Sequence, residues 1–165
     1  MIIFLNGSIN AGKSTVAKLL VQKLPSTAFI EIDVFHEMIE WMSIDKAVPI
    51  NLDNALSVIR NFIKRGINVV VPYPLSQKNY DFMMLGLKDL DTEIHIFTLA
   101  PKLEKVLANT NRGTRKLTDQ EKERVEYHYT IGIPNPTFGE IVDNSDQTPQ
   151  ETADYILSKI HELQS

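Results

Sequence analysis

The sequence predicts an α/β protein in which a parallel sheet is covered by helices on both faces. Short apolar runs alternate along the chain with segments whose apolar residues recur at helical spacing. The strand-like runs are continuously apolar, which is typical of strands buried on both faces. A turn with two glycines, GSINAGKS at residues 7–14, separates the first such run from the first helical pattern. These observations favour one layered domain spanning residues 1–165.

Five segments are predicted as strands, because they are rich in apolar and β-branched residues. In chain order they are IIFLN (2–6), AFIEID (28–33), INVVVP (67–72), TEIHIFTL (92–99) and FGEIVDN (138–144). The third is the most strand-like, and Pro72 and Pro74 end it.

The segments between these strands are predicted mainly as helices. The first runs from Ser14 to Leu24, and the last covers 148–163, with Thr148 as N-cap and Pro149 at the first helical position. The others are expected at 34–42, 53–65 and 78–88, from near Pro101, and at 118–131. The polar and basic stretch NTNRGTRKLTD (109–119) breaks the hydrophobic pattern.

Composition and charge limit the classes of function. The chain has 165 residues, of which 43% are hydrophobic and 23% charged, as is ordinary for one soluble domain. The net charge of −4 argues against nucleic-acid binding through a basic surface. The lack of cysteine excludes disulfides and thiol nucleophiles. No apolar run approaches the ~20 residues of a membrane helix, and MIIFLN lacks the basic start of a signal sequence. We expect a cytoplasmic monomer or homodimer without nucleic-acid or membrane partners.

The turn at residues 7–14 fits the phosphate-loop pattern G-x-x-x-x-G-K-[ST] in full. Glycines let backbone N–H groups turn toward phosphate oxygens, and the N-terminus of the following helix adds favourable partial charge. Lys13 can bridge the β- and γ-phosphates, and Ser14 can offer its hydroxyl to Mg²⁺. A simple strand-to-helix turn capped by Ser14 is the alternative. The predicted nucleotide-binding residues are Gly7, Ser8, Asn10, Ala11, Gly12, Lys13, Ser14 and Thr15.

A carboxylate, Asp33, stands at the end of the second predicted strand, where ligands collect in open α/β sheets. There it can accept a proton from a substrate hydroxyl or help to hold Mg²⁺. The alternative is that Asp33 only caps the following helix, and the two roles are compatible. We predict that Asp33 is catalytic, together with Lys13.

The polar insertion at about 110–120 is predicted as a lid. It carries Arg112, Arg115 and Lys116, and Arg124 follows on the next helix. Phosphoryl transfer spreads negative charge over the migrating group, and arginine is suited to meet that charge. A flap would also exclude water, which competes as acceptor. A solvated loop is the alternative; we predict catalytic roles for Arg112 and Arg115.

The third strand ends in VVVPYPLS, without the acid that orders Mg²⁺ in many phosphate-loop ATPases. This absence disfavours a motor-type ATPase, and the lack of an N-K-x-D motif disfavours a GTPase. Mg²⁺ must then be held by Ser14, the nucleotide and waters, with Asp33 as a further candidate.

These features together resemble the small-molecule kinases of the nucleoside-monophosphate-kinase superfamily, and most of all the chloramphenicol phosphotransferase family. The resemblance is carried by IIFLNGSINAGKST, by Asp33, by RGTR (112–115) and by the last strand running into VDNSDQTPQETADYIL. It implies the three-layer P-loop NTP hydrolase fold, with a five-stranded parallel sheet in the order 2-3-1-4-5 and a short lid. It also implies ATP and Mg²⁺ as cofactors.

The resemblance further implies roles for particular residues. Asp33 would activate the acceptor hydroxyl, Arg112 and Arg115 would embrace the phosphates, and the adenine would lie between a lid arginine and the 143–146 loop, which includes Asn144. The family carries acids where this chain reads PYPL (72–75), so neither its metal arrangement nor its antibiotic specificity transfers safely.

The region 34–62 is predicted to bind the acceptor. Only Arg60 is well placed there to clamp an anion, whereas aromatic and sulfur-containing side chains are plentiful, which favours a neutral or cationic acceptor in a roomy amphipathic pocket. Ordinary core packing of the same side chains is the alternative. The predicted acceptor-binding residues are Phe35, His36, Trp41, Arg60 and Tyr73.

The leading hypothesis is an ATP-dependent phosphotransferase that acts on the hydroxyl of a small organic molecule. A nucleoside or nucleotide kinase, or an enzyme similar to shikimate and gluconate kinases, is the alternative within enzymes. A nucleotide-binding regulatory module without an acceptor is the alternative from another class, and the lid arginines argue against it.

Overall fold

The strands of the computed structural model, which describes residues 1–108 and 116–164, form one parallel sheet. They are β1 (Ile2–Gly7), β2 (Thr27–Phe29), β3 (Asn68–Pro72), β4 (Ile94–Leu99) and β5 (Glu140–Val142). Their spatial order is β2-β3-β1-β4-β5, which confirms the predicted fold class and topology.

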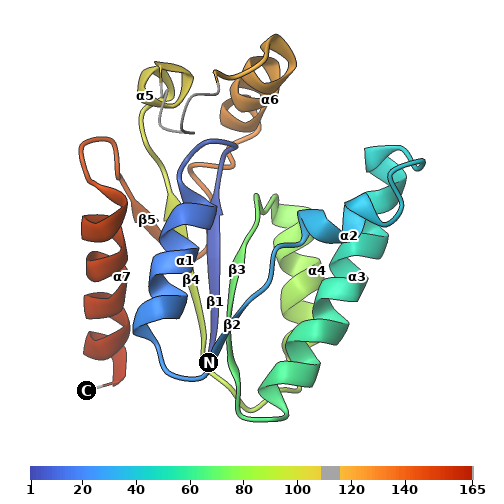
Figure 1. Ribbon diagram of the computed structural model, residues 1–165, viewed down its shortest axis with the longest axis vertical. Helices are drawn as coiled ribbons and strands as arrows, with labels where there is room; N and C mark the ends of the chain where they lie inside the picture. The colour runs from blue at the N-terminus through green and yellow to red at the C-terminus, as the bar shows by residue number, and fades with distance from the viewer. Residues whose placement is uncertain (109–115, 165) are drawn as a thin grey trace.

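Helices cover both faces of this sheet (Figure 1). Helices α1 (Lys13–Lys23) and α7 (Pro149–Gln164) lie on one face, and α3 (Ile44–Ile63) and α4 (Gln77–Leu87) lie on the other. Three further helices, α2 (Asp33–Glu37), α5 (Leu103–Ala108) and α6 (Asp119–Thr130), complete the fold, and α5 and α6 lie beyond the carboxyl ends of the strands. Among the described residues no helix is long and apolar enough to cross a membrane.

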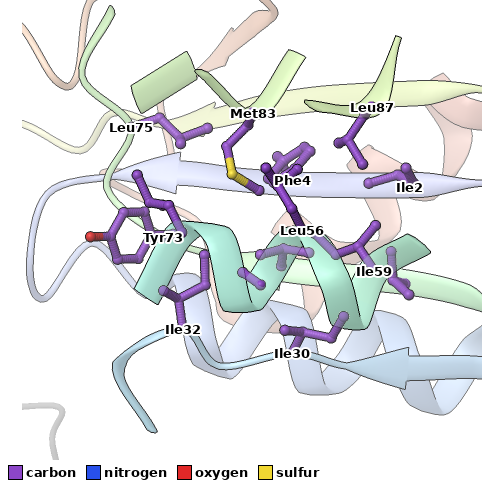
Figure 2. Close-up of a cluster of buried hydrophobic side chains, with 14 of the residues drawn as sticks. Ile2, Phe4, Ile30, Ile32, Leu56, Ile59, Tyr73, Leu75, Met83 and Leu87 are labelled. Atoms are coloured by element: carbon purple, nitrogen blue, oxygen red, sulfur yellow. The ribbon is translucent and has the colours of Figure 1, made fainter. Parts of the chain in front are cut away.

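The core has two halves, because successive side chains of the central strand point to opposite faces of the sheet. Ile2 and Phe4 of β1 belong to the cluster under α3 and α4, part of which is drawn in Figure 2. Ile3 and Leu5 belong to the cluster under α1 and α7. All four side chains are fully buried, which explains why the strand is apolar throughout.

Element boundaries differ from the prediction on the β2 side of the sheet. Strand β2 ends at Phe29, although the Ile30 N–H still bonds to the Val70 carbonyl, and Asp33 begins α2 instead of ending the strand. Helix α3 begins at Ile44 instead of near residue 53. Its buried side chains continue at helical spacing through Pro49, so packing outweighs the one backbone hydrogen bond that proline cannot make.

The predicted cap of the last helix is confirmed. Pro149 is the first residue of α7, the Thr148 hydroxyl accepts the Glu151 N–H at 3.2 Å, and the Glu151 carboxylate accepts the Thr148 N–H at 2.7 Å.

One fully buried polar side chain, Asn6 of β1, connects the loops that surround the carboxyl edge of the sheet. Its amide nitrogen donates to the Thr98 hydroxyl at 3.0 Å and to the Ile133 carbonyl at 3.1 Å. Its amide oxygen accepts the Leu75 N–H at 2.7 Å. Asn6 therefore fixes the segments after β3 and after α6 relative to the strand that leads into residues 7–14.

Candidate active site

The phosphate loop, residues 7–14, needs glycine at two positions. Gly7 has a φ of 141°, and a Cβ added there would lie 2.5 Å from the Leu99 carbonyl oxygen. Gly12 has a φ of 95° and is the N-cap of α1, to which it brings no side-chain cap. The first N–H groups of α1 therefore donate to no capping side chain and suit an anion.

Contacts within and around the phosphate loop hold its shape. The Lys13 ammonium donates to the Ser8 carbonyl at 2.7 Å, and the Ala11 N–H donates to the same carbonyl at 3.2 Å. Asn10, with a φ of 65°, donates from its side chain to the Val106 carbonyl at 2.9 Å. Asn144 donates from its side chain to the Ala11 carbonyl at 3.1 Å. Asn10 thus joins the loop to α5, and Asn144 joins it to the segment between β5 and α7.

A cavity of about 490 Å³, here called the loop cavity, adjoins this structure. It is lined by residues 10–16, by Pro101 and part of α5, and by residues between β5 and the first residue of α7. The Lys102 N–H donates to the Ser145 hydroxyl at 2.9 Å, and Lys105 forms an ion pair with Asp146 at 2.9 Å. The predicted residues Asn10, Ala11, Gly12, Lys13, Ser14, Thr15 and Asn144 all line this cavity. Backbone donors, an ammonium and a hydroxyl in one cavity fit a nucleoside triphosphate.

The Ser14 hydroxyl, which the phosphate-loop pattern assigns to Mg²⁺, contacts the carboxylate of Glu31, a residue that was not predicted from the sequence. The Ser14 hydroxyl donates to Glu31 Oε1 at 3.2 Å. Hydroxyl and carboxylate oxygens are the ligands that Mg²⁺ accepts beside nucleotide phosphates. No cluster of three or more His, Cys, Asp or Glu side chains able to hold a metal occurs in the described part of the chain, so a metal here would depend on the nucleotide as well. The signal was present as EID (31–33) at the end of a predicted strand.

A second and larger cavity of about 1260 Å³, here called the large cleft, meets the loop cavity at Lys13 and Ser14. Glu31, Asp33 and Tyr73 line it at the edge of the sheet. Asp33 is exposed, and no hydrogen bond or ion pair within residues 1–108 and 116–164 engages its carboxylate. The structure therefore brings Asp33 to the same space as the lysine and hydroxyl of the phosphate loop.

Tyr73 is 7% exposed, and its hydroxyl points away from the core cluster (Figure 2). Burial raises the pKa of Tyr73 to about 12, the charge of Asp33 adds to the rise, and the charge of Arg124 opposes it. The phenol is protonated at neutral pH and can donate a hydrogen bond into the large cleft.

The walls of the large cleft are amphipathic. Large apolar side chains reach it from both sides: Ile44, Val48 and Leu52 from α3, Phe82 from α4, Tyr127 from α6, and Ile131 directly after α6. The charged side chains that line it beyond the sheet edge are Asp45, Lys78, Glu121, Glu123 and Arg124. One arginine among the described residues therefore reaches the large cleft, and it comes from α6.

Four predicted acceptor-binding residues are not among those that line the large cleft. Phe35 packs against the core cluster, and His36 is half-buried. Trp41 is 81% exposed. Tyr73 is the one member of the predicted set that the structure places in the cleft.

The structure contradicts the prediction that Arg60 binds the acceptor. Its guanidinium donates to both carboxylate oxygens of Asp89 at 2.6 Å and to the Gly86 carbonyl at 2.7 Å. The hydrogen bonding that Arg60 donates to Asp89 raises the pKa of Arg60, and it lowers the pKa of Asp89 to about 2. Arg60 lies about 12 Å along α3 from Leu52, where the cleft lining ends, since a helix rises 1.5 Å per residue. Arg60 therefore ties α3 to the end of α4 instead of clamping an acceptor.

The lid arginines Arg112 and Arg115 lie outside the described residues. Arg124, to which the sequence analysis gave no catalytic role, lies on α6 and lines the large cleft. Tyr73 lines the same cleft, and the positive charge of Arg124 opposes the rise in the pKa of Tyr73.

The fold and the two cavities define the class of protein. A glycine-containing loop between the central strand and a helix, in a sheet ordered 2-3-1-4-5, is that of a P-loop nucleotide-binding protein. The chain belongs to the chloramphenicol phosphotransferase-like protein family, whose model matches residues 1–161. The resemblance read from the sequence is thereby confirmed, and the family and the fold together support a kinase.

Solved structures of low sequence identity share the fold. The tunicamycin resistance protein of Deinococcus radiodurans is 24% identical, with a TM-score of 0.70 over 96% of this chain and 94% of that chain. The APS kinase of Mycobacterium tuberculosis is 18% identical, with a TM-score of 0.69 over 97% and 96%. A gluconokinase of Sinorhizobium meliloti is 17% identical, with a TM-score of 0.68 over 99% and 96%. Comparison with curated protein sequences gave no significant match.

Proposed function

We propose that this protein is an ATP-dependent phosphotransferase that transfers the γ-phosphoryl group to a hydroxyl of a small organic acceptor. One observation carries the proposal: the loop cavity and the large cleft meet at Lys13 and Ser14, and Asp33 lines the cleft side of that junction. A nucleotide held from one side and an acceptor held from the other would have their reacting groups at the same place.

The residues of the phosphate loop would bind and orient the nucleotide. The backbone N–H groups that open α1 would hold phosphate oxygens, and Lys13 would bridge the β- and γ-phosphates. The Ser14 hydroxyl and the Glu31 carboxylate, which already meet at 3.2 Å, would hold Mg²⁺. When bound, Mg²⁺ would neutralise the charge that develops on the phosphate oxygens.

Asp33 would act on the acceptor. Its exposed carboxylate can orient the hydroxyl and accept its proton as the acceptor oxygen bonds to phosphorus and the bond from phosphorus to the ADP oxygen breaks. Arg124 on α6 would face the negative charge of the migrating group, beside the predicted contribution of Arg112 and Arg115.

The cleft favours an acceptor with an apolar portion and a neutral or cationic charge. Ile44 and Phe82 on one wall and Tyr127 and Ile131 on the other would contact the apolar portion. The segments after β2 bring acids but no arginine to the described lining, whereas an anionic acceptor needs basic partners. Lys78 and Arg124, the basic residues that line the cleft besides Lys13, favour an anionic acceptor instead, such as a nucleoside monophosphate or a hydroxy acid.

A coupled assay of ADP release tests this proposal. The panel contains neutral and cationic amphipathic alcohols, nucleosides, nucleoside monophosphates, shikimate and gluconate. We expect acceptor-dependent ADP release with an uncharged or cationic amphipathic alcohol, and greatest release with an anion would instead select the nucleotide-kinase or hydroxy-acid alternative. Mg–ATP binding without release for any acceptor would favour a regulatory module.

A matched pair of variants tests the role of Asp33. Asp33→Asn keeps the size of the side chain and removes the base, so we expect kcat to fall by roughly 10²–10⁴-fold with little change in Mg–ATP affinity. Asp53→Asn, an exposed position of α3 that is not part of the cleft lining, is the control and should retain parental kcat. Turnover of Asp33→Asn within a few-fold of the parent would remove the assignment.

A further inference from the structure

A buried histidine joins α6 to the phosphate loop. His128 is 9% exposed, and its Nδ1 lies 3.3 Å from the Ser8 hydroxyl oxygen and 3.4 Å from the Ile9 backbone nitrogen. Ser8 is fully buried, so its hydroxyl cannot turn to water for a partner. The sequence separation of 120 residues between Ser8 and His128 explains why no local pattern reveals this contact.

The chemistry of the two loop groups fixes the state of the imidazole. The Ile9 N–H can only donate, so Nδ1 must present a lone pair, and the ring proton must sit on Nε2. The Ser8 hydroxyl can donate to the same lone pair, and sharing between two donors fits two distances longer than the usual 2.9 Å. A protonated ring would replace the acceptor with a donor at this point.

The surroundings of His128 favour the neutral ring. Burial lowers the pKa of His128 to about 4, and the positive charges of Lys13 on the phosphate loop and of Arg124 on α6 act in the same direction. The acceptor state that the geometry requires is therefore the state that exists at neutral pH.

The contact links parts of the site that serve different substrates. The same Ser8 whose hydroxyl meets His128 offers its carbonyl to the Lys13 ammonium at 2.7 Å. Arg124 and His128 are four residues apart on α6 and so lie on one face of the helix. Arg124 and His128 both line the large cleft. The His128 side chain thus connects the loop segment that holds Lys13 to α6, which forms one wall of the large cleft.

We propose that His128 is a positioning residue, whose neutral imidazole holds Ser8 and Ile9 in the loop conformation that receives the triphosphate and holds α6 against that loop. The proposal rests on the proposed function to the extent that the phosphate loop binds a nucleoside triphosphate. His128 itself need not touch either substrate.

Two variants of similar size test this role. Asparagine places its Oδ1 at the position of the histidine Nδ1, so His128→Asn keeps an acceptor for Ser8 and Ile9, whereas His128→Leu removes it. We expect calorimetry to show Mg–ATP binding weakened about tenfold or more in His128→Leu, because the buried Ser8 hydroxyl and the half-buried Ile9 N–H lose their shared acceptor. The affinity of His128→Asn should change less than about threefold. A purely structural role would lower the stability of both variants and leave the affinity of the folded protein unchanged.

Each of the following results would overturn a proposal. Parental affinity in His128→Leu, or equal weakening in both variants, would overturn the role of His128 alone. Absence of Mg–ATP binding by the parent protein would overturn the proposed function as well. Nitrogen NMR of the parent protein with labelled histidine is a second test, and it does not depend on the folding of a variant. We expect the Nε2–H tautomer of His128 at pH 7 and still at pH 5.5. A ring that is protonated at pH 5.5, or an Nδ1–H tautomer, would overturn the inference.

Discussion

Replacing Asn6 with leucine should destabilise the fold by about 3 kcal/mol. The substitution keeps the number and branching of the side-chain heavy atoms but leaves the Leu75 N–H, the Ile133 carbonyl and the Thr98 hydroxyl without their partner in a fully buried place. An unpaired buried backbone group costs about 1–3 kcal/mol, and the hydroxyl about 1 kcal/mol. Burial of the apolar leucine offsets about 2 kcal/mol of this sum of roughly 5 kcal/mol.

Urea denaturation followed by circular dichroism measures this change. A loss of 3 kcal/mol corresponds to a fall in melting temperature of about 6–12 °C for a domain of this size. Asn68→Leu is the control, because Asn68 is only half-buried and its side chain meets the N-terminal amine and the Pro25 carbonyl at the other end of the sheet. We expect it to cost less than about 1 kcal/mol. An Asn6→Leu protein within 1 kcal/mol of the parent would refute the view that Asn6 organises the loops around the site.

Three further predictions concern the site itself. Glu31→Gln should raise the Mg²⁺ concentration for half-maximal activity about tenfold, because Ser14 loses its charged neighbour; an unchanged Mg²⁺ requirement would exclude Glu31 from the metal site. Gly7→Ala should abolish Mg–ATP binding in calorimetry and cost about 3 kcal/mol of stability, since its Cβ would lie 2.5 Å from the Leu99 carbonyl oxygen at a φ of 141°; normal binding would show that the loop tolerates a side chain. Between pH 7 and pH 4.5 the parent should lose about 2–3 kcal/mol more stability than His128→Asn. The reason is that the pKa of His128 is about 4 in the folded protein and about 6.5 in the unfolded chain, so the unfolded chain takes up the proton first. Equal pH profiles of the two proteins in urea titrations would contradict a buried neutral ring.

The parts of the site that the sequence revealed are those encoded locally. The phosphate loop is a fixed spacing of residues between a strand and a helix, so Gly7, Gly12, Lys13 and Ser14 could be assigned without knowledge of the fold. The sheet order followed once this motif had indicated the family. Asp33 was predicted for a similar reason, because the carboxyl ends of parallel strands gather ligands whatever the remaining topology.

The parts that the sequence did not reveal depend on partners far along the chain. Arg60 looked available for an anion because Asp89, its partner across 29 residues, is brought near only by the packing of α3 on α4. Glu31 lies within a segment that was predicted as a strand. Its link to the metal site depends on the hydrogen bond from Ser14, which forms only when α1 packs beside β2. His128 gave no signal, since an isolated histidine on a charged helix is most often solvated.

Helix α3 shows how tertiary packing overrides a local signal. Pro49 is normally unfavourable inside a helix, and the sequence analysis placed the start of this helix after it. The buried side chains of Ala47 and Leu52 on either side of Pro49 continue one apolar face. As a result, the first turns of α3 reach the large cleft and form the wall that was expected from residues such as Trp41.

Titration calorimetry of the parent protein with Mg–ATP, with thermal unfolding measured on the same samples, tests the central claim most directly. The structure predicts one saturable site per chain, lost in Lys13→Ala, and a stabilisation of about 2.7 kcal/mol when the ligand concentration is a hundred times Kd. No heat of binding and no rise in melting temperature would contradict the claim that residues 7–14 enclose a triphosphate, and the roles proposed for Asp33 and His128 would then have no basis.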